Sequence, residues 1–377
     1  MFKLVKHVHV YGPEDLGIKD ILMCNDKIVE VGTDLDYTLP DLTVIDGTGM
    51  LAFPGYIDQH VHVTGGGGEG SFRTRVPELK LSDCIKAGVT TVLGLLWTDS
   101  ITRSVENLVA KTKALNEEGL TAYCLTGSYE YPTKTVTGDV KKDIAFIQEV
   151  LGVKIAISDH RSSHVTKEEL TRLASDVRVA SLISGKPGIL VFHLGKEKAQ
   201  LDLIFEILKD TDIPIKHFRP THAQKVLEQA IEFATMGGYI DFTAGNGGTA
   251  VQYFKAALAA GVDPARLTLS TDSNGSMPRW NEKNEMIGLE AAVMTTLHGT
   301  IRAAIQEHGM PIPTALSFGT QNVARALELD RRKGAIHPGL DADILLLDKD
   351  LNIKTVIARG NIMMREGEIL VKGTFEA

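Results

Sequence analysis

Two kinds of hydrophobic pattern divide the sequence. Residues 1–53 contain short runs in which apolar and polar residues alternate, such as FKLVKHVHVY, with no helical stretch between them. Residues 339–372 show the same pattern. Alternation of this kind is typical of half-buried β-strands. We therefore expect a small β-sandwich built from both ends of the chain, flanking a larger inserted domain.

Between these ends, apolar β-branched runs alternate with amphipathic stretches that favour helices, such as KEELTRLASDVRVASLIS. We predict a further helix over residues 287–305. Eight βα units in about 270 residues are typical of a TIM barrel. The predicted strands lie at residues 55–62, 90–97, 121–127, 152–158, 188–194, 213–221, 239–244 and 267–272.

A doubly wound open sheet is the alternative arrangement of these units. However, no GxGxxG motif opens the first helix, where such a fold would bind a dinucleotide. We therefore predict an α/β fold in which residues 54–334 form a (β/α)8 TIM barrel. Residues 1–53 and 335–377 together would form the small β-sandwich domain.

Composition narrows the possible partners and the compartment. The 377 residues are 43% hydrophobic and carry a net charge of −8, which argues against nucleic acid or an anionic membrane as partner. No apolar run reaches the ~18 residues of a membrane span. The N-terminal residues do not resemble a signal peptide. The cysteines, Cys24, Cys84 and Cys124, form no CxxC motif, which suits a reducing compartment. We expect a cytoplasmic protein.

Chemistry in a barrel of this kind lies at the carboxyl ends of the strands. Alternate residues of a strand point to the same side, so the HxH pair ending the first barrel strand directs two imidazoles into one space. Each residue alone has a structural explanation, such as a helix cap for Asp272, but a buried unpaired Lys154 would be costly. Together they predict a metal site. The residues at these strand ends are His60, His62, Lys154, His193, His222 and Asp272.

A second HxH motif, His7-Val8-His9, lies in the N-terminal β segment. No other candidate ligand is predicted beside it. We interpret these two histidines as exposed side chains on an edge strand.

The metal-ligand set resembles that of the amidohydrolase superfamily with a binuclear metal centre. PGYIDQHVHV and GAIHPGLDADILLLD resemble its entry into the barrel and its return to the β-sandwich. Narrower motifs resemble those of the isoaspartyl (β-aspartyl) dipeptidases, and the likeness covers nearly the whole chain. These motifs are GGGGE at 65–69, GSYEYP at 127–132, VKIAISDHRSS at 153–163, PTHAQK at 220–225 and STDSNGS at 270–276.

The resemblance implies two Zn²⁺ ions per subunit, bridged by a carboxylated Lys154. A metal-bridging hydroxide would attack the scissile amide, and Asp272 would carry the proton to the leaving amine. The family also implies that Tyr129 holds the carbonyl oxygen. From the residues alone, a buried aromatic side chain with a hydrogen-bonded hydroxyl is the preferred interpretation of Tyr129.

A β-aspartyl dipeptide carries one ammonium group and two carboxylates. By resemblance, Glu69 meets the ammonium group, and four residues hold the carboxylates. The sequence departs from the family at Lys225, where the dipeptidases have arginine; lysine keeps the charge but loses the planar fork. The four residues that match carboxylate-binding positions are Gly67, Thr98, Arg161 and Ser276.

We therefore expect a metallopeptidase that acts on small dipeptides and, like its family, forms homo-oligomers. A cyclic-amide hydrolase of the dihydroorotase or hydantoinase kind, or another amidohydrolase deacylase, would share the metals without needing an acid such as Glu69. A non-catalytic scaffold on the same fold is a third alternative. Scaffolds of this kind lose metal ligands, and none is missing from this sequence.

Overall fold

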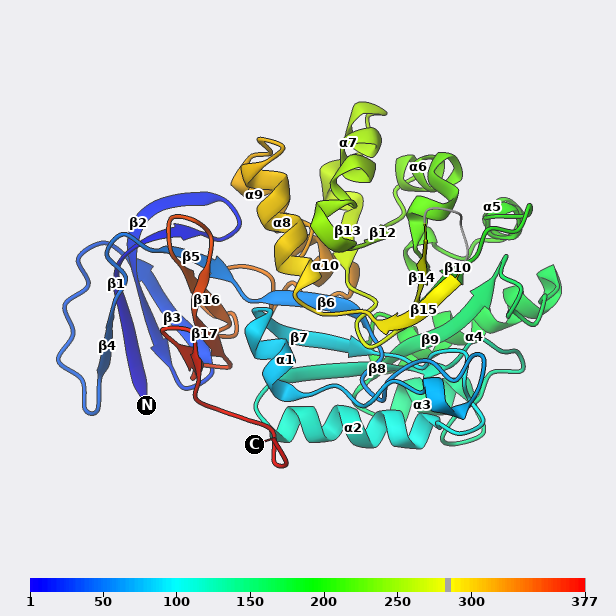
Figure 1. Ribbon diagram of the computed structural model, residues 1–377, viewed down its shortest axis with the longest axis horizontal. Helices are drawn as coiled ribbons and strands as arrows, with labels where there is room; N and C mark the ends of the chain where they lie inside the picture. The colour runs from blue at the N-terminus through cyan, green and yellow to red at the C-terminus, as the bar shows by residue number, and fades with distance from the viewer. Residues whose placement is uncertain (282–285, 377) are drawn as a thin grey trace.

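Eight parallel strands form a barrel in the computed structural model, which describes residues 1–281 and 286–376 (Figure 1). Strands that are consecutive in the chain are neighbours in the sheet. A parallel bridge between Val61 and Ser273 places the last strand beside the first, so the barrel is nearly closed, as predicted. The strands are β6 (Tyr56–Val61), β7 (Val89–Gly94), β8 (Thr121–Gly127), β9 (Val150–Ile157), β10 (Ile189–Leu194), β11 (Phe218–Thr221), β12 (Ile240–Thr243) and β13 (Leu267–Ser270).

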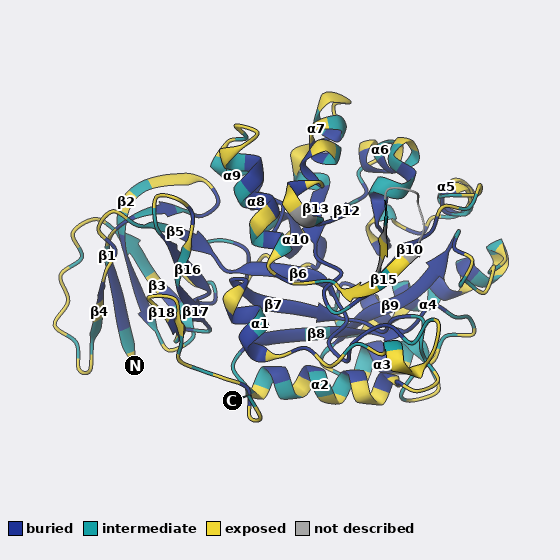
Figure 2. Cartoon of the chain, in the orientation of Figure 1, coloured by how far each residue is buried: buried dark blue, intermediate teal, exposed yellow. Residues whose placement is uncertain are grey.

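Helices connect the strands and cover the outside of the barrel, with exposed residues on their outer faces (Figure 2). The longest amphipathic stretch in the sequence forms α4, where Thr166 and Glu169 make a capping box and Gly185 ends the helix with a φ of 67°. The helices are α1 (Leu81–Lys86), α2 (Val105–Glu117), α3 (Val140–Phe146), α4 (Lys167–Ser184), α5 (Asp202–Asp210), α6 (Leu227–Thr235), α7 (Val251–Ala259), α8 (Thr296–Gln306), α9 (Ile312–Ser317) and α10 (Gln321–Ala326).

Apolar side chains fill the amino-terminal half of the barrel. Leu93, Leu125 and Val191 from three strands pack together with Val323 and Ala324 of α10. Strands covered inside and outside are buried on both faces, which explains why they read as continuous apolar runs. With α10 closing this end of the barrel, only the carboxyl end is open to polar chemistry.

The two ends of the chain together form one mixed sheet of nine strands among the described residues. The order is β19-β18-β17-β16-β5-β1-β2-β3, and β4 pairs with β1. Antiparallel pairing of β5 with β16 joins the N-terminal to the C-terminal segment, as the alternating pattern predicts. The strands are β1 (Phe2–Tyr11), β2 (Asp15–Cys24), β3 (Lys27–Gly32), β4 (Thr43–Asp46), β5 (Leu51–Pro54), β16 (Ile344–Leu347), β17 (Ile353–Ala358), β18 (Asn361–Arg365) and β19 (Glu368–Ile369).

The second HxH motif lies in this sheet and not near the barrel mouth. His7 is exposed at a register shift of β1, with a φ of 56°, and the Nε2 atom of His9 lies 2.6 Å from Asp15. The prediction of solvent-facing side chains holds for His7. The predicted edge position is wrong, because β1 lies between β2 and the β4 and β5 strands.

Two predicted elements differ from the structure. Residues 287–291 belong to β15 (Met286–Ala291), which pairs with β14 (Ser276–Trp280), and the helix begins only at Thr296. Gly288 weakens the helix, and pairing with a neighbouring strand offers the backbone another set of hydrogen bonds. The sixth barrel strand is shorter than predicted, since residues 215–217 form a 3₁₀ turn after Pro214.

The domain limits at residues 53/54 and 334/335 stay a prediction, and residues 282–285 and 377 lie outside the described residues. Within residues 1–281 and 286–376, no helix combines the length and the apolar character needed to cross a membrane.

A buried lysine joins the barrel to the terminal sheet. The Nζ atom of Lys333 donates to Thr121 at the start of β8 (2.7 Å) and to Asp343 just before β16 (2.5 Å). The same atom lies 3.0 Å from Asp341. Both carboxylates are almost inaccessible to solvent, and one ammonium group contacts both of them at the junction. Lys27 and Arg332 add positive charge beside Asp341.

We predict that Lys333→Met destabilises the protein by about 3–5 kcal/mol, since it leaves the buried carboxylate of Asp343 without its cation. Asp341 keeps its ion pairs with Lys27 and Arg332. Lys216→Met is the matched control, because its ion pair with Glu328 is exposed and worth at most about 1 kcal/mol. Urea unfolding of both variants measures the difference. Equal, small losses in the two variants would contradict a structural role for Lys333.

Candidate metal centre and adjoining charged site

The six predicted metal ligands lie at the carboxyl ends of five barrel strands and are at most 3% exposed. Asp272 stands at the centre of the group. Its Oδ1 atom lies 3.2 Å from Nε2 of His60 and 2.9 Å from Nε2 of His62, and its Oδ2 atom lies 3.8 Å from Nε2 of His222.

Hydrogen bonds on the far side of each ring fix the tautomers of His60 and His62. Thr221 donates its own proton to Asp241 (2.8 Å), so its oxygen accepts from Nδ1 of His60 (3.1 Å). The carbonyl of Leu95, which only accepts, lies 3.1 Å from Nδ1 of His62. Each ring therefore turns the lone pair of Nε2 towards the centre.

The electrostatics of this centre call for a cation. Burial lowers the pKa of His60 to about 3 and also lowers that of His62, so both rings are neutral at pH 7. A neutral Nε2 and a carboxylate oxygen, both acceptors, then face each other at 2.9 Å. A metal ion bound by these atoms would satisfy both.

His222 supplies an independent sign of a metal ligand. Its Nδ1 atom lies 2.6 Å from Thr243, but its buried Nε2 atom has no hydrogen-bond partner among the described residues. Ligand atoms of His60, His222 and Asp272 all lie within 4.8 Å of one another. His222 and Asp272 both have positive φ values, 60° and 57°, a conformation uncommon for such residues and found often at functional sites.

Lys154 lies inside the barrel, fully buried, with Nζ 3.3 Å from Nε2 of His60. Burial lowers its pKa to about 7, although Asp272 and Asp241 raise it. A large share of the amine is therefore neutral at pH 7. A neutral amine is nucleophilic, which a lysine at its ordinary pKa is not.

His193 is the predicted ligand that faces away from Asp272. Its ring lies 4.5 Å from that of His222, and its Nδ1 atom is 2.7 Å from the hydroxyl of Tyr129. Its Nε2 atom contacts Asp159 (3.2 Å) and Arg161 (3.0 Å). His193 thus connects the metal-ligand candidates to a second, charged group of residues.

This charged group adjoins the metal-ligand candidates. Asp159 holds Arg161 through two hydrogen bonds, from Nε (2.8 Å) and Nη2 (2.9 Å). The Nη1 atom of Arg161 donates to Oε1 of Glu69 at 2.7 Å. A cation and an anion from two distant segments therefore stand side by side, where a zwitterionic ligand could exchange partners with them.

The other predicted substrate residues lie around this pair. Burial lowers the pKa of Lys225 to about 8, and its Nζ atom donates to the carbonyl of Leu194 (2.7 Å). Gly67 is buried with a φ of 84°, and a Cβ there would lie 2.2 Å from the carbonyl of Thr74, so only glycine fits. Thr98 follows β7 half-buried, and Ser276 begins β14 buried.

Sequence analysis missed two residues of this region, Asp159 and Trp97. Asp159 orients Arg161, and the indole Nε1 atom of Trp97 donates to Glu69 at 2.6 Å. Asp159 stands two residues before Arg161 in the SDHRS motif, so the sequence could have indicated that the two side chains pair. Trp97 reads in sequence as the last apolar residue of a strand, and no pattern distinguishes it from a core residue.

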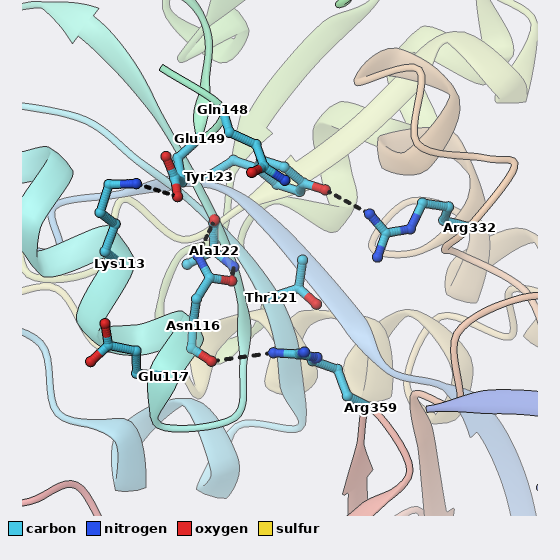
Figure 3. Close-up of a pocket in the computed structure, with 10 residues that line it drawn as sticks. All are labelled: Lys113, Asn116, Glu117, Thr121, Ala122, Tyr123, Gln148, Glu149, Arg332 and Arg359. Carbon is cyan, nitrogen blue, oxygen red and sulfur yellow. Dashed lines mark hydrogen bonds and ion pairs between the residues drawn. The ribbon is translucent and has the colours of Figure 1, made fainter. Parts of the chain in front are cut away.

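A groove of about 680 Å³ leads to this region between the loop after β6 and the β14–β15 hairpin, and Glu69 and Ser276 are among its lining residues. Another cavity, of about 430 Å³, lies at the amino-terminal ends of β8 and β9 (Figure 3). It holds no histidine, and its Lys113 is paired with Glu149. Active sites of such barrels lie at the carboxyl ends of the strands, so we assign the candidate site to the groove.

Comparison with known proteins agrees with this geometry. Residues 213–363 match the model of the amidohydrolase family. The β-aspartyl dipeptidase of Fervidobacterium islandicum AW-1, crystallised with β-Asp-Leu, is 43% identical, with a TM-score of 0.91 over 98% of both chains. The D-hydantoinase of a Thermus species, 16% identical with a TM-score of 0.68 over 99% of this chain and 97% of its own, shares the fold.

Among curated relatives, adenine deaminase 4 of Rhizobium meliloti is 21% identical over 95% of this chain, which spans 56% of the length of that relative. The match to the dipeptidase, by contrast, extends over almost the whole of both proteins at twice that identity. The chain therefore belongs to the amidohydrolase family, as a relative of the β-aspartyl dipeptidases.

Proposed function

We propose that the protein is a metal-dependent dipeptidase that hydrolyses the isoaspartyl (β-aspartyl) peptide bond. The observation that carries this proposal is that a candidate metal site adjoins a pair of oppositely charged side chains. Neutral histidines surround Asp272, and an Arg161–Glu69 ion pair adjoins them. The likeness to a dipeptidase crystallised with β-Asp-Leu supports the same substrate class.

The residues that would hold two divalent ions, Zn²⁺ by donor type, are the six predicted ligands. Bound metal would lower the pKa of water and polarise the scissile carbonyl. The lowered pKa of Lys154 makes its amine available to add carbon dioxide. The resulting carbamate would give the site a second anionic group, as the family resemblance implies. The ligands proposed are His60, His62, Lys154, His193, His222 and Asp272.

Asp272 is the carboxylate among these ligands, and it is positioned to move protons as well. Its Oδ1 atom lies 2.9 Å from Nε2 of His62 and 3.2 Å from Nε2 of His60, where its carboxylate would accept a proton from water. It would then pass this proton to the leaving amine. Tyr129, whose hydroxyl lies 2.7 Å from His193, would donate to the carbonyl oxygen as charge develops there.

Charge-matching would select the β-linkage. The α-ammonium and the α-carboxylate of a β-aspartyl residue branch from the same carbon. The scissile carbonyl lies two bonds away from that carbon, at the end of the side chain. Glu69 would hold the ammonium, while Arg161 and Lys225 would hold carboxylates. Gly67, Thr98 and Ser276 would add polar contacts from the surrounding loops.

We predict that His222→Asn removes most of the bound metal, whereas His217→Asn does not. His217 is the matched control, because it is also a buried histidine, hydrogen-bonded to Gly188 at the other end of β11. Elemental analysis and the rise in Tm on adding Zn²⁺ measure binding, since a ligand specific for the folded state stabilises it. Equal zinc content in the two variants would refute the proposed site.

We predict that Asp272→Asn lowers kcat by about 10²–10⁴-fold, the range of general acid–base catalysis. The amide keeps a ligating oxygen but cannot accept the proton. The comparison requires kcat per bound metal ion, with zinc content measured on the same preparation. A metal-replete variant with turnover near that of the wild type would show that another group carries the proton.

We predict that Glu69→Gln lowers kcat/KM for β-Asp-Leu about tenfold to a hundredfold and spares N-acetyl-β-Asp-Leu, since a hydrogen bond to a charged group is worth about 1.5–3 kcal/mol. Lys225→Ala should also weaken β-Asp-Leu hydrolysis, and Lys225→Arg should preserve it. α-Asp-Leu, dihydroorotate and hydantoin complete the panel. If the wild type prefers a cyclic amide or the N-blocked peptide, the proposed dipeptidase activity is wrong and the protein has another amidohydrolase activity.

A further inference from the structure

Trp97 lies between the metal-ligand candidates and the charged group. It lies three residues after the end of β7 at Gly94 and is only 3% exposed. Its ring meets that of His62 edge-on, with centroids 4.7 Å apart, and the guanidinium of Arg161 lies 5.6 Å from its centroid. One side chain therefore contacts a metal-ligand candidate and a substrate-binding candidate.

The indole also fixes Glu69. Its Nε1–H donates to Oε1 of Glu69 at 2.6 Å, and the same oxygen accepts from Arg161 at 2.7 Å. Two donors on one oxygen fix the position of that oxygen. The described residues donate no hydrogen bond to Oε2, which leaves that oxygen for a ligand.

The side chain of Glu69 extends from a glycine-rich loop and is 38% exposed. In this loop, Gly65, Gly67, Gly68 and Gly70 all have positive φ values. Thr74 donates to the backbone carbonyl of Glu69 (2.9 Å), whereas the direction of the Glu69 carboxylate depends on the contacts of the side chain. Of the two side chains that donate to this carboxylate, Trp97 is neutral and Arg161 is charged. A substrate carboxylate would draw Arg161 away from Glu69 more readily than it would draw the indole.

Two glycines hold the indole itself in place. A Cβ atom at Gly66 would lie 3.2 Å from Cδ2 of Trp97, and one at Gly275 would lie 2.8 Å from Cζ3. The loop after β6 and the loop after β13 thus both approach the ring more closely than a side chain would permit. The ring has little freedom to turn away from Glu69.

We propose that Trp97 is a positioning residue for substrate selection, which holds Glu69 at a fixed place relative to the His62 side of the metal centre. This inference rests on the proposed function. A substrate is then selected when its ammonium and its scissile carbonyl are separated as in a β-aspartyl group. The indole acts through Glu69 and takes no part in the bond-breaking step.

Trp97→Phe tests this role, because phenylalanine keeps an aromatic ring against His62 and lacks the N–H donor. We expect KM for β-Asp-Leu to rise about tenfold, with kcat within about twofold and zinc content unchanged. Hydrolysis of N-acetyl-β-Asp-Leu should stay within about twofold, because that substrate has no ammonium for Glu69 to bind. Circular dichroism and Tm confirm that the variant is folded.

A double-mutant cycle separates positioning from packing. If Trp97 acts through Glu69, then Trp97→Phe in the Glu69→Gln background should change kcat/KM for β-Asp-Leu by less than about twofold. Additive effects, a lower zinc content, or an equal loss on the N-blocked peptide would overturn the inference while leaving the proposed function intact. A wild type without activity on β-Asp-Leu would overturn both.

Discussion

The neutral histidines around the Asp272 carboxylate are the constraint on which the rest of the site depends. Burial keeps the rings uncharged, and hydrogen bonds to Thr221 and Leu95 turn the Nε2 lone pairs inward. Buried acceptors that face one another are costly unless a cation or a donor lies between them. This arrangement makes the barrel mouth a candidate metal site.

The barrel supports this centre with a layer of hydrogen bonds directly beneath it. Asp241 accepts from Thr221, Ser270 and Gln59, while Asp58 accepts from the hydroxyl and the backbone amide of Thr271. Burial raises the pKa of Asp58 to about 7 and that of Asp241 to about 6. These carboxyls hold the strands in the register that presents the ligands, and apolar side chains with α10 close the barrel below.

The charged group adjoins the candidate metal centre and comes from different loops. Asp159 orients Arg161, Arg161 pairs with Glu69, and Trp97 connects Glu69 to the ring of His62. The three loops that carry these residues follow β9, β6 and β7. A hydantoinase at 16% identity shares the fold, so the fold alone does not decide the substrate.

The sequence by itself determined the order of the elements and which donor side chains meet at the barrel mouth. Alternation of apolar runs with amphipathic stretches predicts eight βα units, because strand and helix periods differ. The strand ends then predict His60, His62, Lys154, His222 and Asp272 as neighbours, since parallel strands share one carboxyl end. The pattern also distinguishes the second HxH motif, at residues 7 and 9, from the candidate metal ligands, because it places that motif in the terminal sheet.

Only the tertiary structure decided which contacts these residues make. The strand at residues 286–291 forms because β14 lies beside it, and local pattern favours a helix there. Trp97 has the sequence environment of a core residue, and its contact with Glu69 joins two loops 28 residues apart. His193 faces Asp159 and Arg161 for the same reason. Side-chain direction at a loop depends on packing between segments, and no periodic pattern along the chain encodes it.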